Sequence, residues 1–244
     1  MTLYQQIVKD LRLRANPEKK QILQRFFKTG RGQYGEGDVF LGVVVPDQRA
    51  VAKRFYQDVD LSLVEKLLGN KIHEHRLTAL IMLTYQFPKQ TLVEKKVIFD
   101  FYLGQTQNIN NWDLVDLSAP NIVGEYMLAK KLDIERLVGL ARSPLLWERR
   151  IGIISTLAFI RAVKKGRVGS EWLQPSLKLA RLLLNDKQDL MHKAVGWVLR
   201  EVGKADERLL LEFLNEHFKQ MPRTALRYSI ERLTEVQRHD CLKR

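Results

Sequence analysis

The sequence contains a single cysteine, and this scarcity excludes two kinds of protein. With only Cys241 available, the 244-residue chain can form neither a disulfide framework nor a cysteine metal cluster. It also has no long apolar run, and its first residues are too charged for a secretory signal. These absences predict a cytoplasmic protein that does not cross a membrane.

Positive charge, in contrast, is present in excess. The chain carries 41 lysines and arginines against 28 aspartates and glutamates, a net charge of +13. Such an excess predicts an acidic partner, with nucleic acid ahead of an anionic membrane surface. Because 45% of the residues are hydrophobic, the chain can still bury a substantial core.

Apolar residues recur at helical spacing along most of the chain. Residues 1–14 place Ile7 and Leu11 on one face of a helix. Asn16 and Pro17 then form an N-cap followed by a proline at the first helical position. The same signals predict further helices over residues 18–27, 45–57, 61–70, 73–87, 91–105, 145–166, 173–184, 189–204, 206–219 and 222–233.

The absence of alternating strands and helices favours an all-α fold. Helix pairs recurring every 35–45 residues or so suit a HEAT-like array. We therefore expect one domain over residues 1–244, a curved α-solenoid of HEAT-like helix pairs with a concave basic groove. A compact, irregular helical bundle is the alternative. The valine-rich FLGVVVP (40–46) is expected as a loop entering a helix, and the glycine-rich RGQYGEGD (31–38) as a flexible link.

Two motifs can be set aside on physical grounds. Gly30-x-Gly32-x-x-Gly35 has the letters of a dinucleotide fingerprint, but no strand precedes it and acidic residues follow it. His73 and His75 would point about 200° apart on a helix and so do not share a metal. His73 is expected to be a helix-start residue. We therefore predict neither a cofactor nor a metal.

The segment NNWDLVDLSAP (110–120) places an aromatic residue and two acids in a basic chain. Asn110 or Asn111 is expected to cap a helix, and Asp113 to complement the helix dipole. Trp112 and Asp116, four residues apart, then share one helical face. From spacing alone, this pair is as consistent with core packing as with a functional site.

Three further clusters combine basic residues with helical spacing. The clusters are the adjacent Arg149 and Arg150, the shared face of Lys193, Trp197 and Arg200, and the pair Arg223 and Arg227 four residues apart. Of the adjacent arginines, one can face a groove while the other faces solvent or a neighbouring helix. The Lys193 cluster suits either a functional face or a core helix whose cations extend to solvent, and the Arg223 pair suits either a phosphate-binding ridge or a solvated face.

Six segments of the chain occur in a characteristic order. They are QYGEGDVFLGVVVPDQRAVAKRF (33–55), HEHRLTALIML (73–83), NNWDLVDLSAP (110–120), WERR (147–150), HKAVGWVLRE (192–201) and MPRTALRYSIERL (221–233). Together they resemble the AlkD-like DNA alkylation repair glycosylases, a HEAT-like-repeat family. The resemblance implies an active site on a concave surface, formed by Trp112, Asp116, Arg150 and Trp197. The valines of FLGVVVP depart from the polar residues that some members carry there.

The resemblance also implies a function. We expect a monomeric glycosylase that hydrolyses the N-glycosidic bond of cationic N3- and N7-alkylated purines in double-stranded DNA, without swinging the lesion into a deep pocket. Two alternatives remain: a non-catalytic HEAT-like protein that binds damaged or branched DNA, and a scaffold for an acidic protein partner. Asp116 discriminates between them, because a phosphate-binding surface gains nothing from a carboxylate. The candidate phosphate contacts are Arg149, Lys193, Arg200, Arg223 and Arg227.

Overall fold

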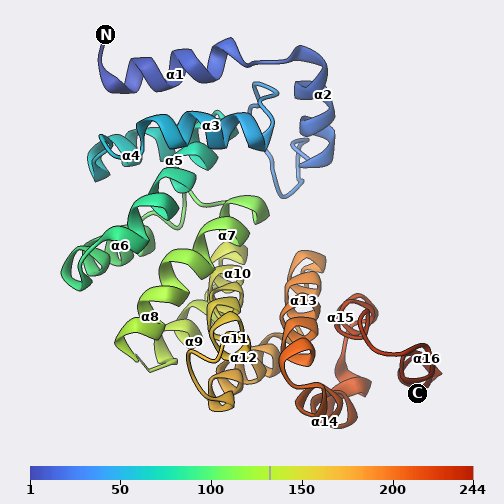
Figure 1. Cartoon of the computed structure of the whole chain (residues 1–244). Coiled ribbons are helices and arrows are strands. Elements are labelled where there is room, and N and C mark those ends of the chain that lie inside the picture. The colour runs from blue at the N-terminus through green and yellow to red at the C-terminus, as the bar shows by residue number, and fades with distance from the viewer. Residues whose placement is uncertain (132, 244) are drawn as a thin grey trace. The chain divides into compact units, whose positions relative to one another are not determined.

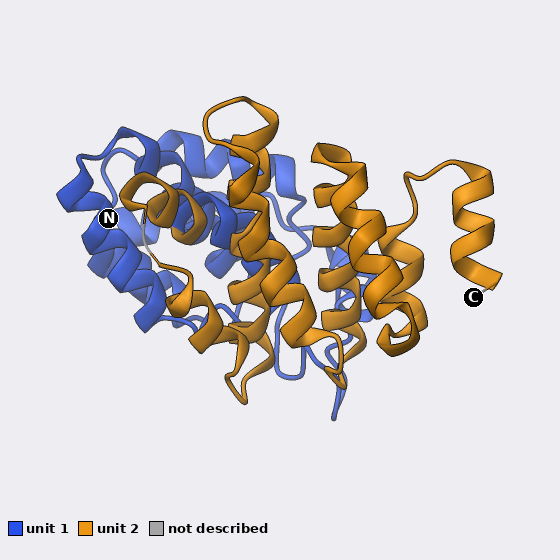
Figure 2. Cartoon of the chain, turned by 90° about the horizontal axis from the view of Figure 1, so that it is seen from below, with its two compact units in different colours: residues 1–122 blue, residues 123–244 orange. Residues whose placement is uncertain are grey.

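A computed structural model of the chain describes residues 1–131 and 133–243, and its regular structure is helical (Figure 1). Within these residues, β structure is limited to one isolated bridge between Val39 and Ile72. The all-α prediction is confirmed. The chain divides into two compact units, Met1–Ile122 and Val123–Arg244 (Figure 2). The prediction of one curved domain with a concave groove concerns both units together, and it stays a prediction.

The first unit is organised around helix α5 (His73–Gln86). Helices α1, α3, α4 and α7 all pack against it, and every residue from His73 to Leu83 is buried. The other elements of this unit are α1 (Leu3–Leu13), α2 (Pro17–Phe26), α3 (Val45–Phe55), α4 (Leu61–Leu68), the 3-10 turn η1 (Phe87–Lys89), α6 (Leu92–Gly104) and α7 (Trp112–Ala119). The π turn η2 (Pro120–Gly124) follows α7.

Local capping chemistry explains where these helices begin. The Asn16 side chain accepts a hydrogen bond from the backbone N–H of Lys19 at 2.9 Å, and Pro17 is the first residue of α2. Both features were predicted from the sequence and are confirmed. At α7 the cap is Asn111, which decides between the two asparagines that the sequence offered.

The valine-rich segment is a loop, as predicted, because its backbone donors are satisfied by a side chain. The buried carboxylate of Glu74 accepts the N–H groups of Leu41, Gly42 and Val43 at 2.9, 2.8 and 3.2 Å. A carboxylate that binds three successive amides replaces the strand partner that this segment lacks. The loop ends where α3 begins, at Val45.

The second unit is organised around α13 (Asp189–Ala205), against which α10, α11, α12, α14 and α15 pack. Helix α15 packs tightly at Gly196, where an added Cβ would lie 2.5 Å from Tyr228 Cβ. The elements around α13 are α8 (Glu125–Lys130), α9 (Glu135–Ala141), α10 (Leu146–Ser155), α11 (Leu157–Lys164), η3 (Ser170–Leu173), α12 (Gln174–Leu183), α14 (Glu207–His217), η4 (Phe218–Gln220), α15 (Arg223–Ser229) and α16 (Glu235–Lys243).

The helix predicted over residues 145–166 is interrupted, and the interruption has a chemical cause. The hydroxyls of Ser155 and Thr156 donate to the carbonyls of Ile151 and Ile153 at 2.6 and 2.7 Å. Such back-bonding competes with the helical ladder and favours a bend. Three observed helices are absent from the predicted set. Helices α8 and α9 are too short for their sequences to show a helical period, and α16 has no buried face because none of its residues is buried. Among the described residues, no helix combines the length and apolarity needed to span a bilayer.

Candidate active site

Helix α7 carries two of the residues predicted to be catalytic, Trp112 and Asp116, one turn apart and both half-buried. Its first turn is held by side chains. Asn111 accepts the N–H of Trp112 at 2.8 Å, and Asp113 accepts the N–H of Leu114 at 2.9 Å. The helix-start role predicted for Asp113 is confirmed.

Trp112 belongs to an aromatic cluster at the end of α2. Its ring stacks on the buried Phe27, with centroids 5.1 Å apart and ring planes 13° apart. The exposed Phe26 meets the indole edge-on at 5.8 Å. The indole Nε1 donates to the Tyr34 hydroxyl at 3.3 Å, and this hydrogen bond keeps the ring from rotating within its own plane. Trp112 is thus packed on one side while it keeps part of its surface exposed.

The glycine-rich segment 31–38 is more than the link that the sequence predicts. Its Tyr34 hydroxyl donates to the Phe26 carbonyl at 3.2 Å, and its last residue, Asp38, is buried. Gly35 lies so close to α2 that an added Cβ would be 2.4 Å from the Phe27 carbonyl oxygen. The segment therefore forms part of the surroundings of Trp112.

A buried charge cluster lies beneath these residues, and sequence reasoning missed it. His73, the first residue of α5 as predicted, is 1% exposed. Its Nδ1 lies 3.0 Å from Asp38 Oδ2, and its Nε2 lies 2.7 Å from Asp113 Oδ2. Arg76 Nη2 donates to Asp38 Oδ1 at 2.5 Å. No spacing rule links these residues, because 35 and 40 positions separate His73 from the two acids.

The electrostatics of this cluster favour its charged form. Burial alone lowers the pKa of His73, but the charge and hydrogen bond of Asp113, with the hydrogen bond of Asp38, raise that pKa to about 9. Burial raises the pKa of Asp38, but hydrogen bonding to His73 and the charge of Arg76 lower it overall. Two cations therefore balance two carboxylates inside the first unit.

Asp116 lies near a second buried polar group, the Tyr102 hydroxyl. Burial and then the Asp116 charge raise the pKa of Tyr102, while its hydrogen bond to Ser118 lowers it. Ser118 donates to the Leu114 carbonyl at 2.5 Å, so Tyr102 donates to Ser118 across 2.8 Å. Tyr102 therefore remains neutral beside Asp116.

In the second unit, the adjacent arginines of α10 make different contacts. Arg150 is buried, and its Nη1 donates to the Leu190 carbonyl in the first turn of α13 at 2.6 Å. Arg149 donates to Asp186 through Nε and Nη2 at 2.6 and 3.3 Å, and its Nη1 reaches two carbonyls of the loop before α10. The Arg149 guanidinium is thus engaged by protein groups, and its predicted contact with DNA stays a prediction.

Helix α13 brings Lys193, Trp197 and Arg200 onto one face, as their spacing predicts. Lys193 Nζ lies 2.8 Å from the exposed Asp189, and Arg200 pairs with the exposed Glu231. Trp197 is half-buried between these two positions. Lys193 is thus paired at the surface, where solvent competes for the ion pair. The Arg200 side chain is only 19% exposed, and its Nε also lies 3.6 Å from Glu201.

Helix α15 adds the last predicted pair, Arg223 and Arg227, both exposed. Arg223 Nη1 donates to the Leu242 carbonyl of α16 at 3.3 Å. Within residues 1–131 and 133–243, Arg227 makes no ion pair. Because α15 packs against α13, the cations of both helices belong to one part of the second unit.

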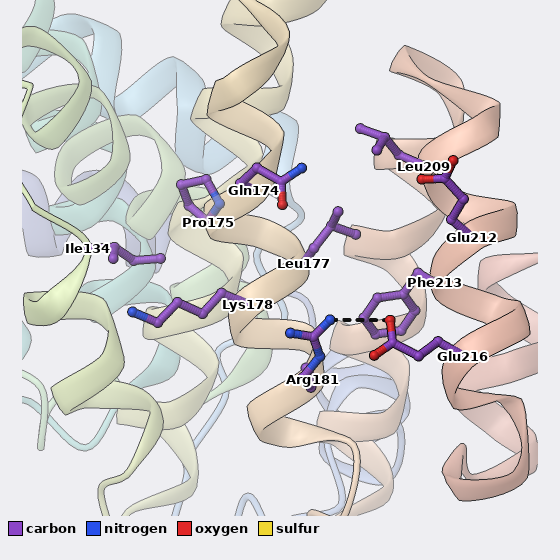
Figure 3. A pocket seen from close by; sticks show the side chains of 10 residues that line it. All are labelled: Ile134, Gln174, Pro175, Leu177, Lys178, Arg181, Leu209, Glu212, Phe213 and Glu216. Atoms are coloured by element: carbon purple, nitrogen blue, oxygen red, sulfur yellow. Dashed lines mark hydrogen bonds and ion pairs between the residues drawn. The ribbon is translucent and has the colours of Figure 1, made fainter.

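A cavity of about 520 Å³ lies between α12 and α14 (Figure 3). Leu177 and Phe213 give it an apolar wall, and an ion pair between Arg181 and Glu216, 3.4 Å apart, lies at its edge. None of the predicted catalytic or phosphate-binding residues lines it. The candidate site is therefore separate from this cavity.

Comparison with known proteins agrees with the predicted family. The model of a family described as DNA alkylation repair enzyme matches residues 7–233. A solved structure described as a predicted DNA alkylation repair enzyme from Enterococcus faecalis is similar to this chain with a TM-score of 0.69, at 16% sequence identity. The match covers 91% of this chain and 98% of that chain, and it indicates a shared fold. No curated protein sequence matches the chain.

Proposed function

Because this chain belongs to the DNA alkylation repair enzyme family, we propose that it is a DNA glycosylase that excises cationic N3- and N7-alkylated purines from duplex DNA. One observation supports this most directly: a half-buried carboxylate, Asp116, lies one helical turn from Trp112 in a chain of net charge +13. A groove that only bound phosphate would gain nothing from this carboxylate. A reaction that develops positive charge on the sugar would.

The chemistry needs only one acid. Alkylation at N3 of adenine or N7 of guanine makes the base cationic, so it departs neutral and requires no proton from the protein. When the bond between the base and C1′ breaks, the deoxyribose becomes oxocarbenium-like. Asp116 stabilises that cation and orients the water that adds to C1′, whose proton it accepts. The products are a free alkylpurine and an abasic site. Ordinary glycoside hydrolysis, in contrast, uses two carboxyl groups.

The two tryptophans suit the same transition state. The face of an indole ring carries negative quadrupole density, and each contact with a cation contributes about 0.5–2 kcal/mol. The stacking on Phe27 orients the ring of Trp112 before the substrate arrives. We assign Trp197 of α13 the corresponding role in the second unit.

The basic residues of the second unit are assigned to the DNA backbone. Contact with the Leu190 carbonyl fixes the plane of the Arg150 guanidinium, which we assign to the phosphate beside the lesion. Lys193 and Arg200 would exchange their carboxylate partners for phosphates. Arg149, Arg223 and Arg227 are assigned to flanking phosphates.

Release of 7-methylguanine from methylated duplex DNA tests this proposal. We expect Asp116→Asn to lower the single-turnover excision rate by about ten- to a thousandfold, or ~1.4–4 kcal/mol of activation free energy. Duplex affinity should be kept or should rise, because a negative charge is lost. The matched control is Asp58→Asn, which removes an exposed carboxylate of the same unit and should leave the rate unchanged.

Two results would contradict the proposal in different ways. Equal excision by the parent and Asp116→Asn would remove the role of Asp116. A parent protein that binds methylated duplex DNA but releases no alkylated purine would instead favour the non-catalytic DNA-binding function.

A further inference from the structure

Three segments of the first unit meet at the His73 side chain. Asp38 comes from the end of the glycine-rich segment, His73 from the start of α5, and Asp113 from the first turn of α7. Arg76, one turn along α5 from His73, completes the cluster by donating to Asp38. All of these side chains are at most 15% exposed, so water does not replace their contacts.

The geometry around the imidazole matches its cationic form. Each ring nitrogen faces a carboxylate oxygen within 3.0 Å. A neutral imidazole carries one N–H, so its other nitrogen would turn a lone pair toward a carboxylate. With the ring protonated, both nitrogens donate, and the two positive charges of His73 and Arg76 balance Asp38 and Asp113.

The cluster holds the residues on both sides of Trp112. Asp113, which follows it, binds His73. Asn111, which precedes it, donates through Nδ2 to Asp38 at 3.2 Å. Asn110 accepts from Arg76 Nη1 at 2.5 Å. Asn110, Asn111 and Asp113, the residues around the start of α7, are therefore each hydrogen-bonded to the buried charges.

Ring packing gives a second connection from His73 to Trp112. The imidazole stacks on Phe40 at 4.6 Å and lies 5.0 Å from the centroid of Phe27. Phe27 in turn stacks on the Trp112 indole at 5.1 Å. A shift of the imidazole would therefore disturb the aromatic contacts of Trp112 as well as its cap.

We propose that His73, as an imidazolium bridging Asp38 and Asp113, is a positioning residue that fixes the start of α7 and so the placement of Trp112 and Asp116. This inference rests on the glycosylase function proposed above. His73 does not touch the substrate; it acts through α7. When His73 loses its proton to solvent at alkaline pH, it can donate to only one of Asp38 and Asp113. The start of α7 is then no longer held in place.

The pH dependence follows from the groups that face His73: Asp38, Asp113 and Arg76. Since their combined effect raises the pKa of His73 to about 9, the proposal predicts an alkaline limb in the excision rate near that pH. Single-turnover rates from pH 6.5 to 9.5, corrected for base loss without protein, measure it. A flat profile over this range would overturn the proposal.

A pair of variants separates positioning from mere burial of a histidine. His73→Gln should lower excision by about ten- to a hundredfold through misplacement of the reacting groups, with duplex affinity unchanged. His75→Gln is the matched control: His75 is equally buried on the same helix, but its ring nitrogens have no partner among the described residues. Burial, and then the charge of Arg12, lower its pKa to about 4, so this control removes no charge at neutral pH. An equal loss of excision in both variants would contradict the proposal.

A third variant keeps the proposal testable if His73→Gln fails to fold. Asp113→Asn retains the shape of the bridge but removes the charge that does most to raise the pKa of His73. Its alkaline limb should move to lower pH by about one unit or more. If the excision rate of Asp113→Asn declines at the same pH as that of the parent, a group other than His73 is titrating.

Nitrogen NMR provides a readout that does not depend on excision. At pH 7 both ring nitrogens of His73 should carry protons, and the Trp112 indole signal, assigned with Trp112→Phe, should shift as His73 titrates. If no alkylpurine is released but these signals behave as expected, the proposed function fails while the buried bridge stands. A neutral imidazole at pH 7 would overturn the inference, whatever the activity.

Discussion

The start of α7 and the exposed face of α13 use charge in opposite ways. At α7 the four charged groups of Asp38, His73, Arg76 and Asp113 are nearly inaccessible and face one another. On α13, Lys193 is 41% exposed and pairs with Asp189, which is 60% exposed, while Arg200, itself 19% exposed, pairs with Glu231, which is 48% exposed. The charges at α7 are fixed inside the protein, whereas the pair of Lys193 and Asp189 lies at the surface.

The difference indicates what each set can do. A buried ion pair is costly to break, because the partner left behind stays buried and unpaired. An exposed pair contributes little to stability, so phosphate can replace its carboxylate at small cost. The buried cluster therefore suits positioning of Trp112 and Asp116, and the α13 face suits exchangeable binding of an anion.

Breaking the buried cluster should give the largest effect on stability. Arg76→Met leaves Asp38 buried with one cation fewer, and we expect it to lower the free energy of unfolding by about 3–5 kcal/mol. Arg54→Met is the control, since Arg54 is 68% exposed and lies 3.4 Å from Asp10; we expect a loss of at most ~1 kcal/mol. Urea denaturation at pH 7 measures both. Equal losses would erase the contrast between buried and exposed charges.

A smaller effect is expected from pH alone. The pKa of His73 is raised to about 9 in the folded protein and is about 6.5 in the unfolded chain. The resulting stabilisation is complete below pH 6.5 and is lost as the pH rises through 9. It amounts to about 3 kcal/mol. Urea denaturation at intervals from pH 6.5 to 9.5 should show this decline in the parent protein and not in His73→Gln. A parallel decline in both would assign it to other groups.

The two regions also differ in how far sequence reasoning reached. Local rules placed the cap at Asn16, the loop before α3 and the shared face of Trp112 and Asp116, because each depends on neighbouring residues. The bridge at His73 depends on residues 35 and 40 positions away, and only the fold brings them together. The break at Thr156 was missed for a similar reason. A hydroxyl can bond to a helix carbonyl or to solvent, and spacing does not decide between them.

The smallest effect on stability, and the one most specific to DNA, is expected on α13. Lys193→Gln should change the free energy of unfolding by less than ~1 kcal/mol, because its ion pair with Asp189 is exposed. It should nevertheless weaken duplex binding about equally for all sequences and lower the salt slope by about 1, since one phosphate contact is lost. Lys178→Gln on α12 removes the same charge from a similar pair with Glu135 of α9 and should leave the slope unchanged. If both variants shift the slope equally, the effect comes from net charge and not from a binding face on α13.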